Sequence, residues 1–134
     1  MSGHDQIKRS IKSFVRRSGR MTPAQKNALK TYWPMYGIEF SQSQPDFLSE
    51  FEALKLEIGI GNGDAIIDMA TADPGSLYLG IEVHEPGIGR CLNIIHQQEL
   101  ANVRLLKHDA VEVLETMIAP GSLDRILLFF PDPW

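Results

Sequence analysis

Two amphipathic helical patterns are found near the N-terminus. Residues 5–17 place apolar side chains on one helical face and basic side chains on the other. The apolar positions of this face are Ile7, Ile11, Phe14 and Val15. Thr22 followed by Pro23 is typical of an N-cap and a first helical turn, so a second helix is expected there. Residues 34–46 contain two prolines and a glycine and are expected to form a loop.

From Leu54 onward, short apolar runs alternate with helical patterns. The runs predict strands at 54–58, 77–83, 103–109 and 123–130, and the intervening patterns predict helices at 64–72, 85–100 and 110–118. Strict alternation with short connections predicts βαβ units, and therefore an α/β fold with a parallel sheet and helices on both faces. The last run, ILLFF, is continuously apolar, as expected of a strand that is buried on both sides.

Charge divides the chain into two parts. Residues 1–30 carry eight basic side chains against Asp5 alone, whereas residues 31–134 carry five basic and sixteen acidic side chains. A basic segment on an acidic body indicates a polyanionic partner such as a nucleic acid. The alternative is a solvated helix face that is attracted to the acidic body of its own chain.

Cysteine content and hydropathy suggest a location. Cys91 is the only cysteine, so the chain cannot form an internal disulfide and fits a reducing compartment. No apolar run approaches the roughly 20 residues of a membrane helix, and the first residues lack the apolar stretch of a secretory signal. The expected location is therefore cytoplasmic, with no contact with a membrane.

A glycine-rich loop follows the first predicted strand, in the sequence LEIGIGNGDAI. Gly59, Gly61 and Gly63 alternate behind Glu57, and such residues permit left-handed backbone and let a ligand touch the main chain. Ligands of parallel α/β sheets bind outside the carboxyl ends of the strands, where this loop lies. A tight strand-to-helix turn without a ligand is the alternative, although three alternating glycines exceed what a turn requires.

The acidic residues around this loop narrow the choice of ligand. In the dinucleotide fingerprint G-x-G-x-x-G the third glycine would fall at position 64, which is Asp. Asp64 at a helix start and Glu57 before the loop would both repel a diphosphate. S-adenosyl-L-methionine fits better, since it has a sulfonium and an ammonium group and no phosphate. An NAD-linked oxidoreductase is the less favoured alternative.

Two further carboxylates end the next two predicted strands. Glu82 lies 19 residues after Gly63 and is placed to accept both hydroxyls of a ribose, a device that NAD enzymes share. Asp109 is placed to accept a hydrogen bond from an adenine amino group, or to cap the following helix. His84 and His108 flank these strand ends without the cysteine or carboxylate pattern of a metal site, so no metal is expected.

The chain reaches the sequence PDPW directly after the fourth predicted strand. Two prolines would hold Asp132 rigidly, and Trp134 offers a stacking face. Asp132 is therefore a candidate catalytic residue beside the donor, and a simple turn is the alternative.

Together, the motifs LEIGIGNG, GIEVHEPGIG, KHDAVEVL and LFFPDPW resemble those of the bacterial tRNA (guanine-N7-)-methyltransferases. The segments IKSFVRRSGRMT and YWPMYGIEF are similar to the N-terminal region of the same family. The resemblance implies a Rossmann-like class I methyltransferase that is truncated after the fourth strand, with a basic helical arm at 1–45 and a donor-binding α/β domain at 46–134.

The resemblance also implies a donor, an acceptor and site residues. The donor would be S-adenosyl-L-methionine and the acceptor N7 of a guanine in the variable loop of tRNA. Glu57, Glu82, Asp109 and Asp132 match the family's donor-binding positions, and Asp132 its proposed catalytic residue. Charge adds Arg16, Arg17 and Arg20 as candidate RNA contacts. A catalytically silent nucleotide- or RNA-binding fragment is the alternative function, and the oligomeric state stays open.

Overall fold

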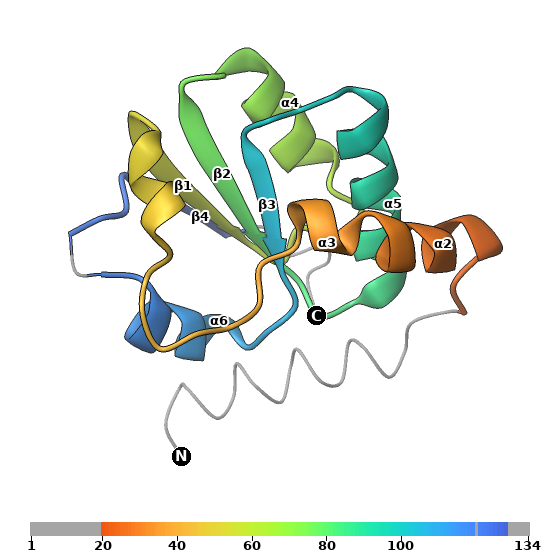
Figure 1. Cartoon of the computed structure of the whole chain (residues 1–134), viewed down its shortest axis with the longest axis horizontal. Coiled ribbons are helices and arrows are strands. Elements are labelled where there is room, and N and C mark those ends of the chain that lie inside the picture. Colours follow the sequence, from red (N-terminus) through yellow and green to blue (C-terminus); the bar gives the residue numbers. More distant parts are fainter. Residues whose placement is uncertain (1–19, 120, 129–134) are drawn as a thin grey trace.

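A computed structural model describes residues 20–119 and 121–128 of the chain (Figure 1). The helix expected at 5–17 therefore lies outside the described residues. The helical elements are α2 (Pro23–Thr31), α3 (Trp33–Tyr36), η1 (Asp46–Glu50), α4 (Asp64–Ala72), α5 (Glu85–Gln97), α6 (Ala110–Glu112) and the π-helical turn η2 (Val113–Met117). The strands are β1 (Ala53–Ile58), β2 (Ser76–Ile81), β3 (Val103–Leu106) and β4 (Arg125–Leu128).

The four strands form one parallel sheet in the order β3-β2-β1-β4. The chain runs outward from β1 through β2 to β3 and then crosses back to place β4 on the other side of β1. The connection from β1 to β2 leads to one side of β1, and the connection from β3 to β4 leads to the other side. The boundary between β1 and β4 is therefore the switch point of the sheet, where such folds bind ligands. The α/β class and the parallel sheet predicted from the alternating pattern are confirmed.

Two apolar clusters lie on opposite faces of the sheet. One cluster joins α4 and α5 to the sheet, and the helical face predicted for residues 85–100 lies in it: Ile88, Cys91, Leu92 and Ile95. The other cluster packs Leu54, Leu56, Leu77, Leu79 and Ile81 against η1, α6 and η2. Figure 1 shows the two groups of helices on either side of the strands, so the prediction of helices on both faces is confirmed.

Helix α2 packs against α5 as part of the first cluster. Thr22 caps it as predicted, by accepting a hydrogen bond from the Gln25 amide at 3.1 Å, while the Gln25 side chain accepts one from the Thr22 amide at 2.9 Å. Ala28 is fully buried in the cluster, and Gly89 of α5 lies directly against the backbone of Gln25. The described part of residues 1–45 therefore shares a core with the sheet, and a domain boundary at 45 and 46 stays a prediction.

Local structure differs from the expectation in two segments. The loop expected at 34–46 begins inside α3, because Pro34 fits the first turn of a helix, where its missing N–H is not needed. The helix expected at 110–118 divides after three residues into α6 and the wider π-helical turn η2. That change of winding keeps Val113 and Met117 buried, which a plain apolar periodicity does not reveal.

The outer side of the sheet ends at β4 within the described residues. Ile126 and Leu128 are 49% and 55% exposed, although both are large and apolar. Burial on both sides, which the apolar run alone favours, is therefore wrong for these two positions, whereas the edge position expected for the last strand of a truncated fold agrees with the strand order. An edge strand of this kind is prone to pair with another chain.

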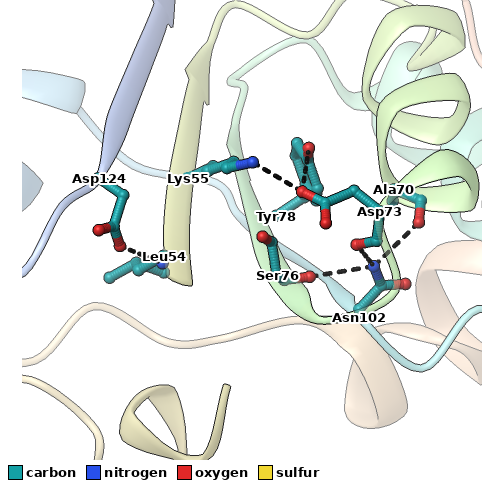
Figure 2. A network of polar contacts seen from close by, with 8 residues as sticks. All are labelled: Leu54, Lys55, Ala70, Asp73, Ser76, Tyr78, Asn102 and Asp124. Carbon is teal, nitrogen blue, oxygen red and sulfur yellow. Dashed lines mark hydrogen bonds and ion pairs between the residues drawn. The ribbon is translucent and has the colours of Figure 1, made fainter. Parts of the chain in front are cut away.

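A polar network connects the amino ends of the strands, at the edge of the sheet opposite the glycine-rich segment (Figure 2). The buried side-chain amide of Asn102 lies 3.0 Å from each of the carbonyl oxygens of Ala70, Asp73 and Ser76. Asp73 accepts hydrogen bonds from Lys55 at 2.6 Å and from Tyr78 at 3.0 Å. The Lys55 contact, helped by Ser76 and Tyr78, lowers the pKa of Asp73 to about 2. These contacts hold the α4–β2 connection against the start of β3.

Replacing Asn102 by Ala is expected to lower the free energy of unfolding by about 2 to 3 kcal/mol, because buried carbonyls lose their donor. Urea denaturation measures the loss. Asn93→Ala is the matched control: its amide donates to the Ala24 carbonyl at 3.3 Å near the surface, so the loss should stay below about 0.5 kcal/mol. Equal losses in the two variants would contradict a special role for the buried amide.

Candidate functional site

The glycine loop joins β1 to α4 at the carboxyl edge of the sheet. Gly59, Gly61 and Gly63 have φ angles of 75°, 59° and 87°, all in the left-handed region that favours glycine. The Gly59 amide donates to the Ile81 carbonyl at 2.8 Å and the Gly63 amide to the Ile60 carbonyl at 2.9 Å. The loop is thus a fixed structure whose backbone follows the end of the neighbouring strand.

The two later glycines of the loop have different surroundings. A Cβ atom on Gly61 would meet nothing within 4 Å, so this side of the loop is open. A Cβ atom on Gly63 would overlap the Cys91 side chain of α5, and one on Gly87 would overlap the Gly61 carbonyl. Gly63 and Gly87 therefore let α5 approach the loop, while Gly61 leaves room for a ligand.

Glu82 follows β2 directly and joins the ends of the first two strands. Its carboxylate accepts hydrogen bonds from the amides of Gly61 at 2.8 Å, Val83 at 2.9 Å and His84 at 3.0 Å. The structure places Glu82 beside the glycine loop as the sequence predicts, whereas its contact with a ribose stays a prediction.

Glu57 is the last polar side chain of β1, and it is almost completely buried. Only 1% of the residue is exposed, and neither carboxyl oxygen has a hydrogen-bond partner among the described residues. Burial, and secondarily the negative charge of Glu82, raise the pKa of Glu57 to about 7. Burying a carboxyl group without a hydrogen-bond partner costs folding free energy. The position of Glu57 therefore indicates a functional role and not a stabilising one.

Asp109 follows β3 and caps α6, since its Oδ2 accepts a hydrogen bond from the Glu112 amide at 3.2 Å. The helix cap, which the sequence left as the alternative for Asp109, is confirmed, and the favoured contact with adenine stays a prediction. The neighbouring His108 approaches Glu112 with 2.7 Å between Nε2 and Oε2. Its ring stacks on Phe40 with 3.9 Å between the ring centroids.

The contact between Phe40 and His108 belongs to a longer attachment of the N-terminal segment to β3. Gly37 forms a parallel bridge with Leu105, and the Ile38 amide donates to the Leu105 carbonyl at 2.8 Å. The segment after α3 therefore runs beside β3 and reaches the same sheet edge as Asp109. Sequence reasoning missed this neighbour of the site, because no short-range pattern links residues almost seventy positions apart. Its only local signal is the apolar Ile38 and Phe40 within a polar segment.

Asp64 begins α4 as expected, but its charge is partly compensated. Arg90 of α5 donates to the Asp64 carboxylate at 2.8 Å and to the Asn62 carbonyl at 3.1 Å. Asp64 therefore repels an anionic ligand less than the sequence alone suggests. The buried, unpaired Glu57 is the stronger argument against a diphosphate in this loop.

The remaining site predictions fall at the ends of the chain. Asp132, Arg16 and Arg17 lie outside the described residues, and Arg20 is exposed just before α2. Within residues 20–119 and 121–128, no group of three or more His, Cys, Asp or Glu side chains is arranged to hold a metal ion. The helices in this described part are all too short or too polar to cross a membrane.

The strand order, the glycine loop and the acidic strand ends together define a class I methyltransferase fold. A solved antibiotic-related methyltransferase shares this fold, with a TM-score of 0.50 and 22% identity over 66% of this chain and 45% of that one. The family model described as "Putative methyltransferase" matches residues 52–134.

Curated relatives define the family more closely. The chain is 52% identical to the tRNA (guanine-N(7)-)-methyltransferases of Salmonella choleraesuis (strain SC-B67) and of Yersinia pestis (strain Pestoides F). Each match covers 94% of this chain and 54% of the relative, so the chain spans about half the length of the curated relatives it matches. The chain belongs to the tRNA (guanine-N(7)-)-methyltransferase family, and the resemblance read from its motifs is confirmed.

Single substitutions of Gly61 and Gly63 by Ala should distinguish the open side of the loop from the side that packs against α5. Gly61→Ala is expected to lower the free energy of unfolding by about 1 kcal/mol, the cost of a left-handed alanine in open space. Gly63→Ala adds an overlap with Cys91, for about 1 to 3 kcal/mol more. Urea denaturation compares the two. If Gly63→Ala were no more costly than Gly61→Ala, the close packing of α5 on the loop would be disproved.

Proposed function

We propose that the chain takes part in transferring a methyl group from S-adenosyl-L-methionine to N7 of a guanine in the variable loop of tRNA. The observation that carries the proposal is the identity of 52% over 94% of the chain with enzymes named for that activity. The proposal also fits a cytoplasmic protein that acts on RNA.

The described residues fit this donor. Glu57 and Glu82 bring two carboxyl groups to an edge where a cationic ligand would be stabilised, and Gly61 leaves its side of the loop open. Glu57 would face the cationic part of the donor, Glu82 the ribose hydroxyls and Asp109 the adenine amino group. The donor supplies an electrophilic methyl carbon on a positively charged sulfur.

The acceptor needs little chemical activation. Guanine N7 has an in-plane lone pair and bears no proton at neutral pH, so no base is needed to expose it. The main task is then to hold N7 in line with the methyl carbon, and positioning of this kind is worth up to roughly 7–11 kcal/mol. We assign Asp132 the role of accepting hydrogen bonds from the N1–H and amino groups of guanine, which would orient the base.

The basic N-terminal residues supply the proposed contacts with tRNA. Arg16, Arg17 and Arg20 are candidate phosphate ligands, and phosphate contacts make RNA affinity fall steeply with salt. Helix α2 begins three residues after Arg20 and packs on α5, and the segment after α3 lies beside β3. The described structure thus supports an arm that approaches the same sheet edge as the donor.

A second candidate is a fragment that binds the donor or RNA without transferring a methyl group. It is favoured by the exposure of Ile126 and Leu128 on β4 and by the half-length match to the curated relatives. In this alternative the strands β1, β2 and β3 bind the donor, but no methyl group is transferred.

A methyl-transfer assay on unmodified tRNA tests the function. The chain is incubated with methyl-labelled S-adenosyl-L-methionine, and the label is mapped by chemical cleavage at N7-methylguanosine. The expected result is one labelled guanine in the variable loop. The full-length Salmonella choleraesuis relative is the positive control. Donor binding without transfer, beside an active relative, would support the silent fragment instead.

Asp132→Asn tests the catalytic assignment. The amide is expected to lower turnover by at least about tenfold, and by far more than it lowers donor affinity, because the proposed contacts are made to the guanine in the transition state. Single-turnover methyl transfer and calorimetry with S-adenosyl-L-methionine give the two quantities. Unchanged turnover would remove Asp132 from the chemistry.

A further inference from the structure

Glu57 has surroundings that no stabilising role explains. Its neighbours in β1, Leu56 and Ile58, point into the cluster with η1 and α6. Because side chains alternate along a strand, Glu57 points to the opposite face, toward α4 and α5. There it is 1% exposed, and its two oxygens have no hydrogen-bond donor in the described part of the chain.

Among the described residues, the charged groups near Glu57 do not neutralise it. Glu82 is the charged group that acts on it, and the Glu82 carboxylate itself accepts three backbone amides. The Cys91 thiol is kept neutral, since burial and then the charge of Glu57 raise its pKa to about 12. The cations on adjoining elements have other partners or lie away from it: Arg90 with Asp64, Lys55 with Asp73, and the exposed Arg125 of β4 beside Lys55.

The Glu82 carboxylate thus has three amide donors, whereas the Glu57 oxygens have none in the described part of the chain. We infer that Glu57 carries a proton in the ligand-free protein and that binding a cationic adenosyl ligand releases this proton to solvent. This inference rests on the proposed function, because it specifies how the same site selects its ligand.

The consequence is a preference for a positively charged ligand. A cation beside Glu57 stabilises the carboxylate, so one proton leaves as one positive charge enters and the local charge stays constant. A neutral adenosyl compound offers nothing to stabilise the carboxylate, so Glu57 keeps its proton. The loop therefore distinguishes S-adenosyl-L-methionine from neutral thioethers such as 5′-methylthioadenosine by charge as well as by shape.

The pH range follows from the raised pKa of Glu57, which is about 7 in the free protein. A bound cation lowers that pKa. Binding therefore releases the proton only at pH values between the pKa of Glu57 in the bound protein and its pKa in the free protein. In that range the affinity for the cationic ligand rises up to about tenfold per pH unit, and the rise becomes shallower as the pH approaches the pKa of free Glu57. The affinity for a neutral ligand does not follow this course.

Calorimetry with S-adenosyl-L-methionine in buffers of different ionisation enthalpy measures the released protons. The expected release is about one proton per ligand at pH 6 and about half a proton at pH 7, with no release for 5′-methylthioadenosine. Glu57→Gln should abolish the release. Glu50→Gln, an exposed carboxyl group in η1 on the opposite face, should leave it unchanged.

A titration without any ligand gives a separate test. In the carbon-13 carboxyl spectrum of the free chain, one resonance should titrate near pH 7 and disappear in Glu57→Gln. A Glu57 resonance that titrates near pH 4 to 5 would overturn the inference, as would binding of the cationic ligand at pH 6 without proton release. Failure to bind S-adenosyl-L-methionine at any pH, with the titration near pH 7 intact, would instead contradict the proposed function.

Discussion

The left-handed backbone of the glycine loop is the constraint on which the rest of the site depends. Three residues with positive φ turn the chain from the end of β1 into α4 within a few residues. The turn brings the Gly61 amide to the Glu82 carboxylate and allows α5 to pack against Gly63. Because α5 closes over this face of the sheet, Glu57 is buried. The local conformation of three glycines thus determines the electrostatic character of the whole edge.

The two carboxyl groups at this edge of the sheet, Glu57 and Glu82, favour the binding of a cation more than they favour the stability of the fold. Glu82 satisfies its carboxylate with backbone amides, whereas the oxygens of Glu57 have no partner among the described residues. The polar network at the amino end shows the opposite arrangement, in which Asn102 and Asp73 are both satisfied by close contacts. The same sheet therefore holds a polar group for stability at one end and a costly carboxyl group at the other. This contrast supports a binding role for the glycine-loop edge.

The sequence predicts those features that depend on local pattern. Alternating apolar runs predict the parallel sheet, Thr22 and Pro23 predict the start of α2, and the three glycines predict the loop. Contacts between distant segments cannot be read in the same way: Arg90 reaches Asp64, and Phe40 reaches His108, only after the helices have packed. The π-helical turn η2 also depends on packing, since its sequence has an ordinary helical pattern.

The position of the strands separates the proposed donor side of the site from the proposed acceptor side. β1, β2 and β3 carry the described candidate residues Glu57, Glu82 and Asp109, and both faces of these strands are packed. β4 lies beyond the switch point, and Ile126 and Leu128 are half exposed. Under the proposed function, Glu57, Glu82 and Asp109 belong to the donor side, and Asp132, which follows β4 in the sequence, belongs to the acceptor side. We therefore expect donor binding to depend on the well-packed strands β1, β2 and β3, and methyl transfer to depend also on the exposed strand β4.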